Sequence, residues 1–121
     1  MNLFQLFAGQ RAFIGKVNMD RNGFGGYQET TPDSINETKS FVASVLNMKS
    51  DLVEPIITPR FVPTCTKELL ETLGEIAKKD DLRIQTHLSE CKPELAWVKE
   101  LEPWAKDYTD VYDKTGLLTD K

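Results

Sequence analysis

Histidine is the residue that this sequence has least of, with a single copy at position 87. Histidine is the commonest neutral ligand for zinc and the side chain that most readily moves protons near neutral pH. Catalytic zinc usually has three protein ligands and one open position for water. His87 alone cannot build such a site, so the sequence leaves open which residues would supply the missing ligands.

Cysteine is also scarce. The two cysteines, Cys65 and Cys91, do not form a Cys-x-x-Cys pair. This excludes the zinc deaminases of the cytidine type, whose signature joins His-x-Glu to Pro-Cys-x-x-Cys. We expect both cysteines to be free thiols, as in a reducing compartment. The glycine-rich residues 22–26 lack the G-x-G-x-x-G order and open no helix, so we expect no phosphate site there.

Long apolar runs and blocks of like charge are missing as well. No segment reaches the roughly 18 apolar residues of a membrane-spanning helix, and the first residues lack the charged head of a signal peptide. The 15 basic and 19 acidic residues give a net charge of −4 and are spread along the chain. We therefore expect a soluble, cytoplasmic protein with neither nucleic acid nor a membrane as a partner.

The sequence that is present alternates between strand and helix patterns. Apolar residues before Gly9 resemble the last turns of a helix, and Thr31 with Pro32 resembles the start of another. Strands are expected at residues 12–19, 53–58 and 82–87, and helices at 31–48, from 64 or 66 to about 77, from about 93, and at 108–118. Three consecutive βα units favour a parallel sheet with right-handed crossovers, in either a flavodoxin-like or a (βα)8 architecture.

Four residues that could carry chemistry follow the expected strands. In parallel α/β folds the loops after the strands gather on one face, so Arg60, His87 and Glu90 could converge on one pocket. Arginine offers a planar fork of donors to a heterocycle, and Phe61 offers a face for stacking. His87 could bind a metal, and Glu90 could carry a proton.

Each of these residues also has a purely structural interpretation. A lone histidine at a strand end is often structural or solvent-facing, and Glu90 precedes a helix whose positive end favours a carboxylate. Arg60 could form a surface ion pair, and Phe61 could pack in the core. The residue types alone leave both interpretations open.

A family resemblance supports the chemical interpretation. It is carried by residues 11–20 (RAFIGKVNMD), 57–61 (ITPRF), 84–90 (IQTHLSE) and 108–114 (YTDVYDK). Together, and in register over nearly the whole chain, these segments resemble the guanine deaminases of the amidohydrolase superfamily. The resemblance implies an α/β fold: a partial TIM-like (βα)8 barrel of about three consecutive βα units, strands three to five of the family barrel.

The resemblance also implies roles for the candidate residues. It makes His87 a zinc ligand, Glu90 the catalytic proton shuttle, and Arg60 and Phe61 the residues that contact the purine, with His87 and Glu90 beside them in the substrate site. The family's first-strand His-x-His, sixth-strand histidine and eighth-strand aspartate have no counterpart here. We therefore expect residues 1–121 to be a fragment of a metal-dependent amidohydrolase catalytic domain, inactive by itself.

Two functional hypotheses of different classes follow. The first is part of a zinc-dependent guanine deaminase, homodimeric when complete, which hydrolyses guanine to xanthine and ammonia. Its enzymatic alternative is a deaminase of another aminated purine, pterin or triazine. The second hypothesis is a noncatalytic, truncated product that acts only by association, because unpaired strand edges invite pairing with another chain.

Overall fold

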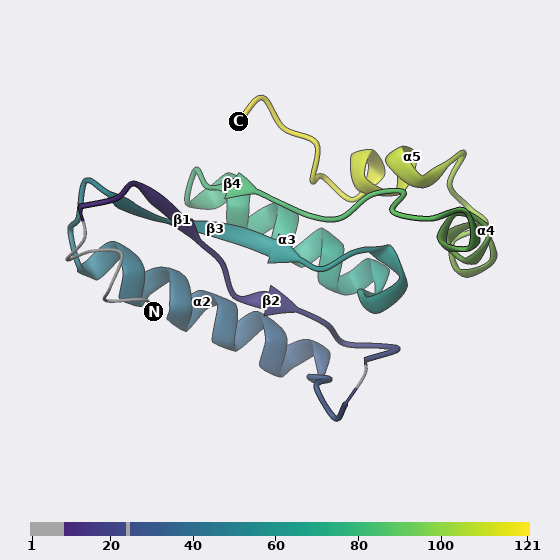
Figure 1. The fold of residues 1–121 in the computed structure, drawn as a ribbon, viewed down its shortest axis with the longest axis horizontal. Coiled ribbons are helices and arrows are strands. Elements are labelled where there is room, and N and C mark those ends of the chain that lie inside the picture. The colour runs from purple at the N-terminus through teal and green to yellow at the C-terminus, as the bar shows by residue number, and fades with distance from the viewer. Residues whose placement is uncertain (1–8, 24) are drawn as a thin grey trace.

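The computed structural model describes residues 9–23 and 25–121 (Figure 1). The expected helix end before Gly9 falls on residues outside this range. The elements in chain order are β1 (Ala12–Ile14), β2 (Val17–Asn18), α2 (Thr31–Asn47), β3 (Val53–Pro59), the 3-10 turn η1 (Val62–Thr64), α3 (Lys67–Lys79), β4 (Arg83–Ile84), α4 (Lys92–Leu101) and α5 (Tyr108–Lys114). The alternation of strands and helices agrees with the three expected βα units.

The sheet is parallel and is organised around β3. β1, β2 and β4 all pair with β3 in parallel, as the strand–helix alternation predicts. Figure 1 shows the arrows of β2, β3 and β4 pointing toward the end of the molecule that carries α4. The carboxyl ends of the strands, and the loops that follow them, therefore lie together.

The prediction of one strand over residues 12–19 is wrong in detail, because the strand is interrupted. Ala12 pairs with Val53 and Val17 with Thr58, so β1 and β2 keep the same register against β3 on both sides of Gly15. A Cβ on Gly15 would collide with the Thr58 hydroxyl and the Ile56 carbonyl oxygen. Glycine thus allows a close backbone approach at the break.

The third strand is shorter than residues 82–87. Only Arg83 and Ile84 form the regular ladder of β4. Beyond them the chain continues beside β3 through single hydrogen bonds, from Gln85 N–H to the Ile57 carbonyl (2.9 Å) and from His87 N–H to the Arg60 carbonyl (3.0 Å). His87 is therefore still held at the sheet edge.

Threonines cap α2 and α3, with one shift from the expectation. Thr30, not Thr31, caps α2 by accepting a hydrogen bond from Asp33 N–H (3.2 Å), while the Thr31 hydroxyl donates to Asp20 (2.6 Å). Thr66 caps α3, in agreement with one of the two expected starts. α5 ends at Lys114 rather than 118, and Gly116 follows with φ of 82°, which suits glycine at a helix end.

The core lies between the sheet and the helices. Ile57 from β3, Val42 from α2, and Leu69, Leu70 and Leu73 from α3 belong to one cluster of buried side chains. Burying this apolar stripe is the main stabilising contribution to the packing of both helices on the sheet.

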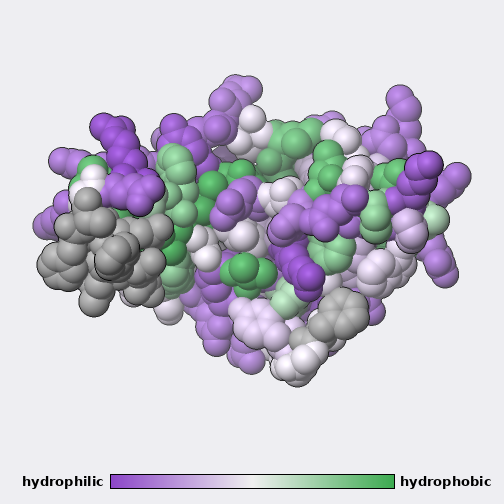
Figure 2. All heavy atoms as spheres, viewed as in Figure 1, coloured by the Kyte–Doolittle hydropathy of each residue, from purple (hydrophilic) through white to green (hydrophobic). Residues whose placement is uncertain are grey.

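The opposite face of the sheet is more exposed. Phe13 is 53% exposed, with the Arg83 guanidinium 5.1 Å from its ring centroid and Glu54 3.1 Å from Arg83. In Figure 2, apolar side chains lie among polar ones across the middle of the visible face. None of the helices in the described part of the chain combines the length and apolarity that a bilayer crossing requires.

Candidate active site

The backbone of Arg60 joins the two strands beside β3. Its N–H donates to the Asn18 carbonyl (3.2 Å) at the end of β2, and its carbonyl accepts from His87 N–H (3.0 Å) beyond β4. Arg60 therefore stands directly between the loops that leave the neighbouring strands. This arrangement brings the predicted residues together at the carboxyl edge of the sheet.

The Arg60 side chain is held over the following phenylalanine. Its guanidinium carbon lies 5.1 Å from the Phe61 ring centroid, and Nη1 lies 3.3 Å from the sulfur of the buried Met19. The Phe61 and His87 rings meet edge to face, with centroids 6.5 Å apart and an interplanar angle of 75°. The guanidinium and the two rings thus occupy one region of the surface.

The hydrogen bond of the His87 ring to the backbone fixes the tautomer of the neutral imidazole. Its Nδ1 lies 2.9 Å from the Arg60 carbonyl oxygen. A carbonyl oxygen can only accept, so Nδ1 must carry the hydrogen, and in the neutral ring Nε2 keeps its lone pair. Such a hydrogen bond to a backbone carbonyl is the usual way in which a protein orients a metal-binding histidine.

Glu90 faces the free nitrogen of His87. The distance from Nε2 to Glu90 Oε1 is 3.4 Å, and both side chains are 57% exposed. Ser89 turns the chain with φ of 54°, and Glu90 N–H donates to the carboxylate of the buried Glu94 (3.1 Å) at the start of α4. The Nε2 lone pair and the Glu90 carboxylate both accept hydrogen bonds. Their close approach is stabilised when a proton or a cation lies between the two atoms.

The four predicted residues line one small cavity. Arg60, Phe61, His87 and Glu90 surround about 240 Å³ and are its only lining residues in the part of the chain that the structure describes. A second hollow of about 490 Å³ shares Phe61 and Glu90 and extends to Cys91, Pro93, Glu94 and Trp97 on α4. A flat heterocycle entering the cavity would meet donors, an aromatic face, an imidazole and a carboxylate.

The described residues offer one suitable metal ligand but not a complete metal site. Among residues 9–23 and 25–121, no group of three or more histidine, cysteine, aspartate or glutamate side chains is placed to hold a metal ion. His87 Nε2 is a suitable single ligand, because Nδ1 is already bonded to the backbone. A complete metal site would need ligands beyond those that the described residues bring together.

Residues to which the sequence analysis gave no role hold the strand ends and the helix starts together at this edge. Asp20 accepts from the hydroxyls of Thr31 and Thr66 (both 2.6 Å) and from Thr66 N–H (2.8 Å). One carboxylate thereby fixes the first turns of α2 and α3 against the end of β2. Its position directly after an apolar strand was the only available signal in the sequence.

A second support is the buried Asn18. Its side-chain amide donates to the hydroxyls of Ser34 and Thr38 (both 2.8 Å). Its backbone carbonyl accepts a hydrogen bond from Cys65 Sγ (3.2 Å). Burial raises the pKa of the Cys65 thiol to about 11, so the thiol stays protonated and able to donate. Asn18 thus links β2 to α2 and to the residue that precedes the Thr66 cap.

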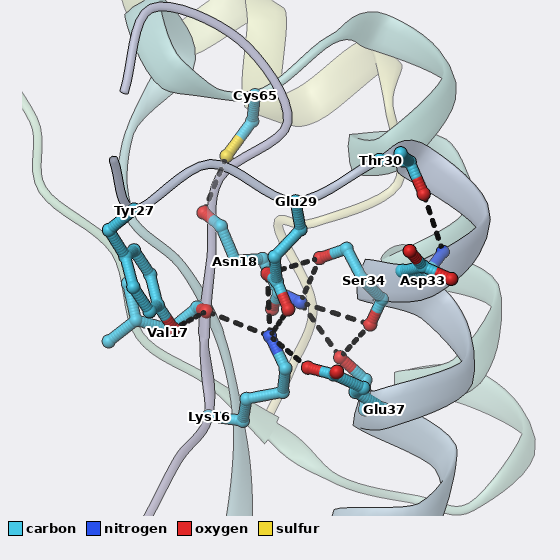
Figure 3. A network of polar contacts seen from close by, with 11 residues as sticks. Lys16, Val17, Asn18, Tyr27, Glu29, Thr30, Asp33, Ser34, Glu37 and Cys65 are labelled. Atoms are coloured by element: carbon cyan, nitrogen blue, oxygen red, sulfur yellow. Dashed lines mark hydrogen bonds and ion pairs between the residues drawn. The ribbon is translucent and has the colours of Figure 1, made fainter. Parts of the chain in front are cut away.

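The same network extends to the surface through Lys16, as Figure 3 shows. The Lys16 amine points between the carboxylates of Glu29 (2.6 Å) and Glu37 (3.8 Å), and Glu29 also accepts from the Ser34 hydroxyl (3.1 Å). Burial by itself would raise the pKa of Glu29. The hydrogen bonds, chiefly from Lys16, outweigh burial and hold that pKa below its usual range.

A family model described as "Amidohydrolase family" matches residues 2–121. The chain belongs to the amidohydrolase family. The guanine deaminase of Pongo abelii is 54% identical over 114 residues, which cover 93% of this amidohydrolase chain and 25% of the relative. This chain therefore spans about a quarter of the length of that relative.

The chain is also similar to segments of solved structures. A guanine deaminase from C. acetobutylicum, with guanine bound in its active site, is 41% identical with a TM-score of 0.93, covering 98% of this amidohydrolase chain and 28% of that protein. An atrazine chlorohydrolase from Arthrobacter aurescens, complexed with zinc and atraton, is 17% identical with a TM-score of 0.76, covering 93% and 26%. The second likeness concerns the fold alone.

Proposed function

We propose that this chain is part of a zinc-dependent guanine deaminase, which hydrolyses guanine to xanthine and ammonia. The observation that carries the proposal is the cavity in which Arg60, Phe61, His87 and Glu90 meet. The similarity to guanine deaminases over 93% of the chain supports the choice of substrate. We further propose that its strands are the third to fifth of a (βα)8 catalytic barrel and that residues 1–121 lie within that domain.

His87 would be one of the zinc ligands, through Nε2. A zinc ion held there would lower the pKa of water toward neutrality and so would make a nucleophile available near pH 7. The hydrogen bond from Nδ1 to the Arg60 carbonyl prepares the imidazole for this role, because it fixes both the tautomer and the ring plane.

Glu90 would move the protons of the reaction. Water adds to C2 of guanine, and the bond from C2 to the exocyclic amino nitrogen breaks. The Glu90 carboxylate would take one proton from the attacking water and deliver it to N3 of the ring, then take the remaining proton from the C2 hydroxyl and give it to the amine, which leaves as ammonia and leaves the C2 carbonyl of xanthine. Its position 3.4 Å from His87 Nε2 places it beside the ligand that would hold the metal.

Arg60 and Phe61 would bind the purine. The guanidinium can donate to the carbonyl oxygen or a ring nitrogen of guanine, and the Phe61 ring offers a stacking surface. Because Met19 and Phe61 already hold the guanidinium in place, little conformational freedom is lost when the purine binds.

The test is a substrate comparison in the complete protein that carries this segment. Ammonia release is measured with guanine, another aminated purine, a pterin and a triazine, with Glu90→Gln as the control. Guanine should give the highest kcat/KM, and Glu90→Gln should lower kcat by about 10²–10⁴-fold. Better turnover of another ring would reject guanine as the substrate.

A further inference from the structure

His87 is restrained more tightly than its exposure requires. Its side chain is 57% exposed, yet its backbone N–H and its ring Nδ1 both bond to the Arg60 carbonyl (3.0 and 2.9 Å). Its own carbonyl accepts a third hydrogen bond, from the Tyr112 hydroxyl (2.7 Å). An exposed side chain usually keeps its rotamer freedom, so this restraint suggests an imidazole whose direction matters.

The Tyr112 hydroxyl comes from α5, which is 25 residues further along the chain. Tyr112 is only 2% exposed, and burial raises the pKa of its phenol, which therefore keeps its hydrogen for donation. The hydroxyl of Thr86 lies 3.1 Å from the Tyr112 oxygen and 3.2 Å from the Arg60 carbonyl oxygen. Tyr112 thus contacts the chain on both sides of the His87 imidazole, at the Thr86 hydroxyl before it and at the His87 carbonyl after it.

The hydrogens in this group can be counted. Tyr112 has one hydroxyl hydrogen, and the His87 carbonyl, which has none to offer, takes it. The single hydroxyl hydrogen of Thr86 is then free for the Arg60 carbonyl or the Tyr112 oxygen. In either arrangement, Tyr112 fixes the peptide plane that follows His87, just before the Ser89 turn.

We propose that Tyr112 is a positioning residue that aims His87 Nε2 into the cavity beside Glu90. It does not touch the substrate; it acts through the backbone of His87 and through Thr86. The inference rests on the proposed function in one respect, since the imidazole is the proposed zinc ligand. It adds a residue of the YTDVYDK segment that the proposed mechanism leaves without a role.

The chain contains a matched control in the same helix. Tyr108 is 6% exposed, and its ring lies 5.7 Å from that of Tyr112. Among residues 9–23 and 25–121, its hydroxyl makes no hydrogen bond to His87, Thr86 or the Arg60 carbonyl. Tyr108→Phe and Tyr112→Phe therefore remove the same atom from similar surroundings, but only the second change releases His87.

The first measurement is the dissociation constant for zinc, determined in the complete protein by competition with a chelator. Tyr112→Phe should raise this constant by roughly tenfold, the lower end of the usual effect of outer ligands, whereas Tyr108→Phe should leave it unchanged. With guanine, Tyr112→Phe should lower kcat while KM stays close to the wild-type value, because Arg60 and Phe61 are untouched. Equal effects of the two substitutions would overturn the inference.

The second measurement requires neither zinc nor turnover. Nitrogen-15 chemical shifts of the His87 imidazole are recorded in the metal-free complete protein and assigned by their loss in His87→Gln. The wild type and Tyr108→Phe should show the Nδ1–H tautomer, and Tyr112→Phe a mixture of tautomers. Thr86→Val, which removes the other hydroxyl of the group, should shift the same signals and serves if Tyr112→Phe does not fold.

These readouts separate the two proposals. A wild type that does not turn over guanine, with His87 signals that still respond to Tyr112→Phe alone, would reject the deaminase assignment and keep the positioning role. Normal turnover of guanine, with His87 signals and zinc affinity indifferent to Tyr112→Phe and Thr86→Val, would reject the positioning role alone.

Discussion

At the scale of single residues, the two cysteines differ in their surroundings and should differ in reactivity. Cys65 is fully buried with a pKa of about 11, two units above its ordinary value of 9.0, whereas Cys91 is exposed at the start of α4. Two units correspond to a thiolate fraction roughly 100-fold lower, before access is considered. In the native complete protein at pH 8, iodoacetamide should modify Cys91 and spare Cys65.

Peptide mapping by mass spectrometry checks this prediction, with the protein in denaturant as the control in which both thiols react. Rapid native labelling of Cys65 would mean that the contact between Cys65 and Asn18 opens readily in solution.

The Lys16–Glu29 pair should make stability depend on pH. The pKa of Glu29 is held below the ordinary 4.5, so the pair stabilises the fold above that pH and loses its contribution as the pH falls through the lowered value. Lys16→Met should cost about 1.5–3 kcal/mol at pH 7, the usual range for hydrogen bonds to charged groups. The loss should be smaller at pH 3 than at pH 7, because more of Glu29 is protonated at the lower pH.

Urea denaturation of the complete protein at both pH values measures the difference, with Lys39→Met on α2 as a lysine control outside the pair. A loss from Lys16→Met that is the same at both pH values would show that the charge of Glu29 does not matter.

At the scale of elements, the contact between α3 and the end of α5 depends on one glycine. A Cβ on Gly74 would lie 2.8 Å from the Thr115 carbonyl oxygen and 3.1 Å from that of Gly116. Alanine improves helix propensity by about 1 kcal/mol, but overpacking of this kind usually costs about 1–3 kcal/mol. Gly74→Ala should therefore destabilise the protein despite the better propensity.

Calorimetric Tm values of the complete protein decide the matter, with Glu75→Ala on the exposed side of the same helix as the control, expected within about 0.5 kcal/mol of the wild type. A rise in Tm for Gly74→Ala would show that α5 can move away without loss.

The elements that could be predicted from the sequence are those whose signals are local. The apolar run of β3, the Thr66 cap and the Gly116 stop each depend on a few adjacent residues. The meeting of Arg60, Phe61, His87 and Glu90 was also predictable, because parallel strands end at one edge.

The features that were missed depend on distant partners. Thr31 does not cap α2, since Asp20, 11 residues earlier, takes its hydroxyl. The single strand expected over residues 12–19 is broken where Gly15 approaches Thr58. Tyr112 gives no local sign that its hydroxyl serves His87, 25 residues earlier. No periodicity or capping pattern carries such information.

At the scale of the whole molecule, we expect the 121-residue chain alone not to deaminate guanine, even with added zinc. The sequence has one histidine, and the described residues hold no cluster of three potential ligands. His87 and one carboxylate are too few to keep zinc in an open tetrahedral site. The cavity of about 240 Å³ also lacks walls that exclude water, which can cost several orders of magnitude in rate.

Xanthine formation by the purified chain, with and without zinc, tests this expectation against His87→Ala. Zinc-dependent turnover that disappears in the alanine variant would show that a working site can assemble from these residues, most simply between copies of the chain.

The peptide unit of Arg60 gives the proposed site one further property. Its side chain would contact the purine, while its carbonyl oxygen holds the imidazole that would bind the metal. A displacement of this one residue is transmitted to both ligands, so their binding free energies should be coupled. By thermodynamic linkage, the metal must then change the affinity for the purine by the same factor by which the purine changes the affinity for the metal.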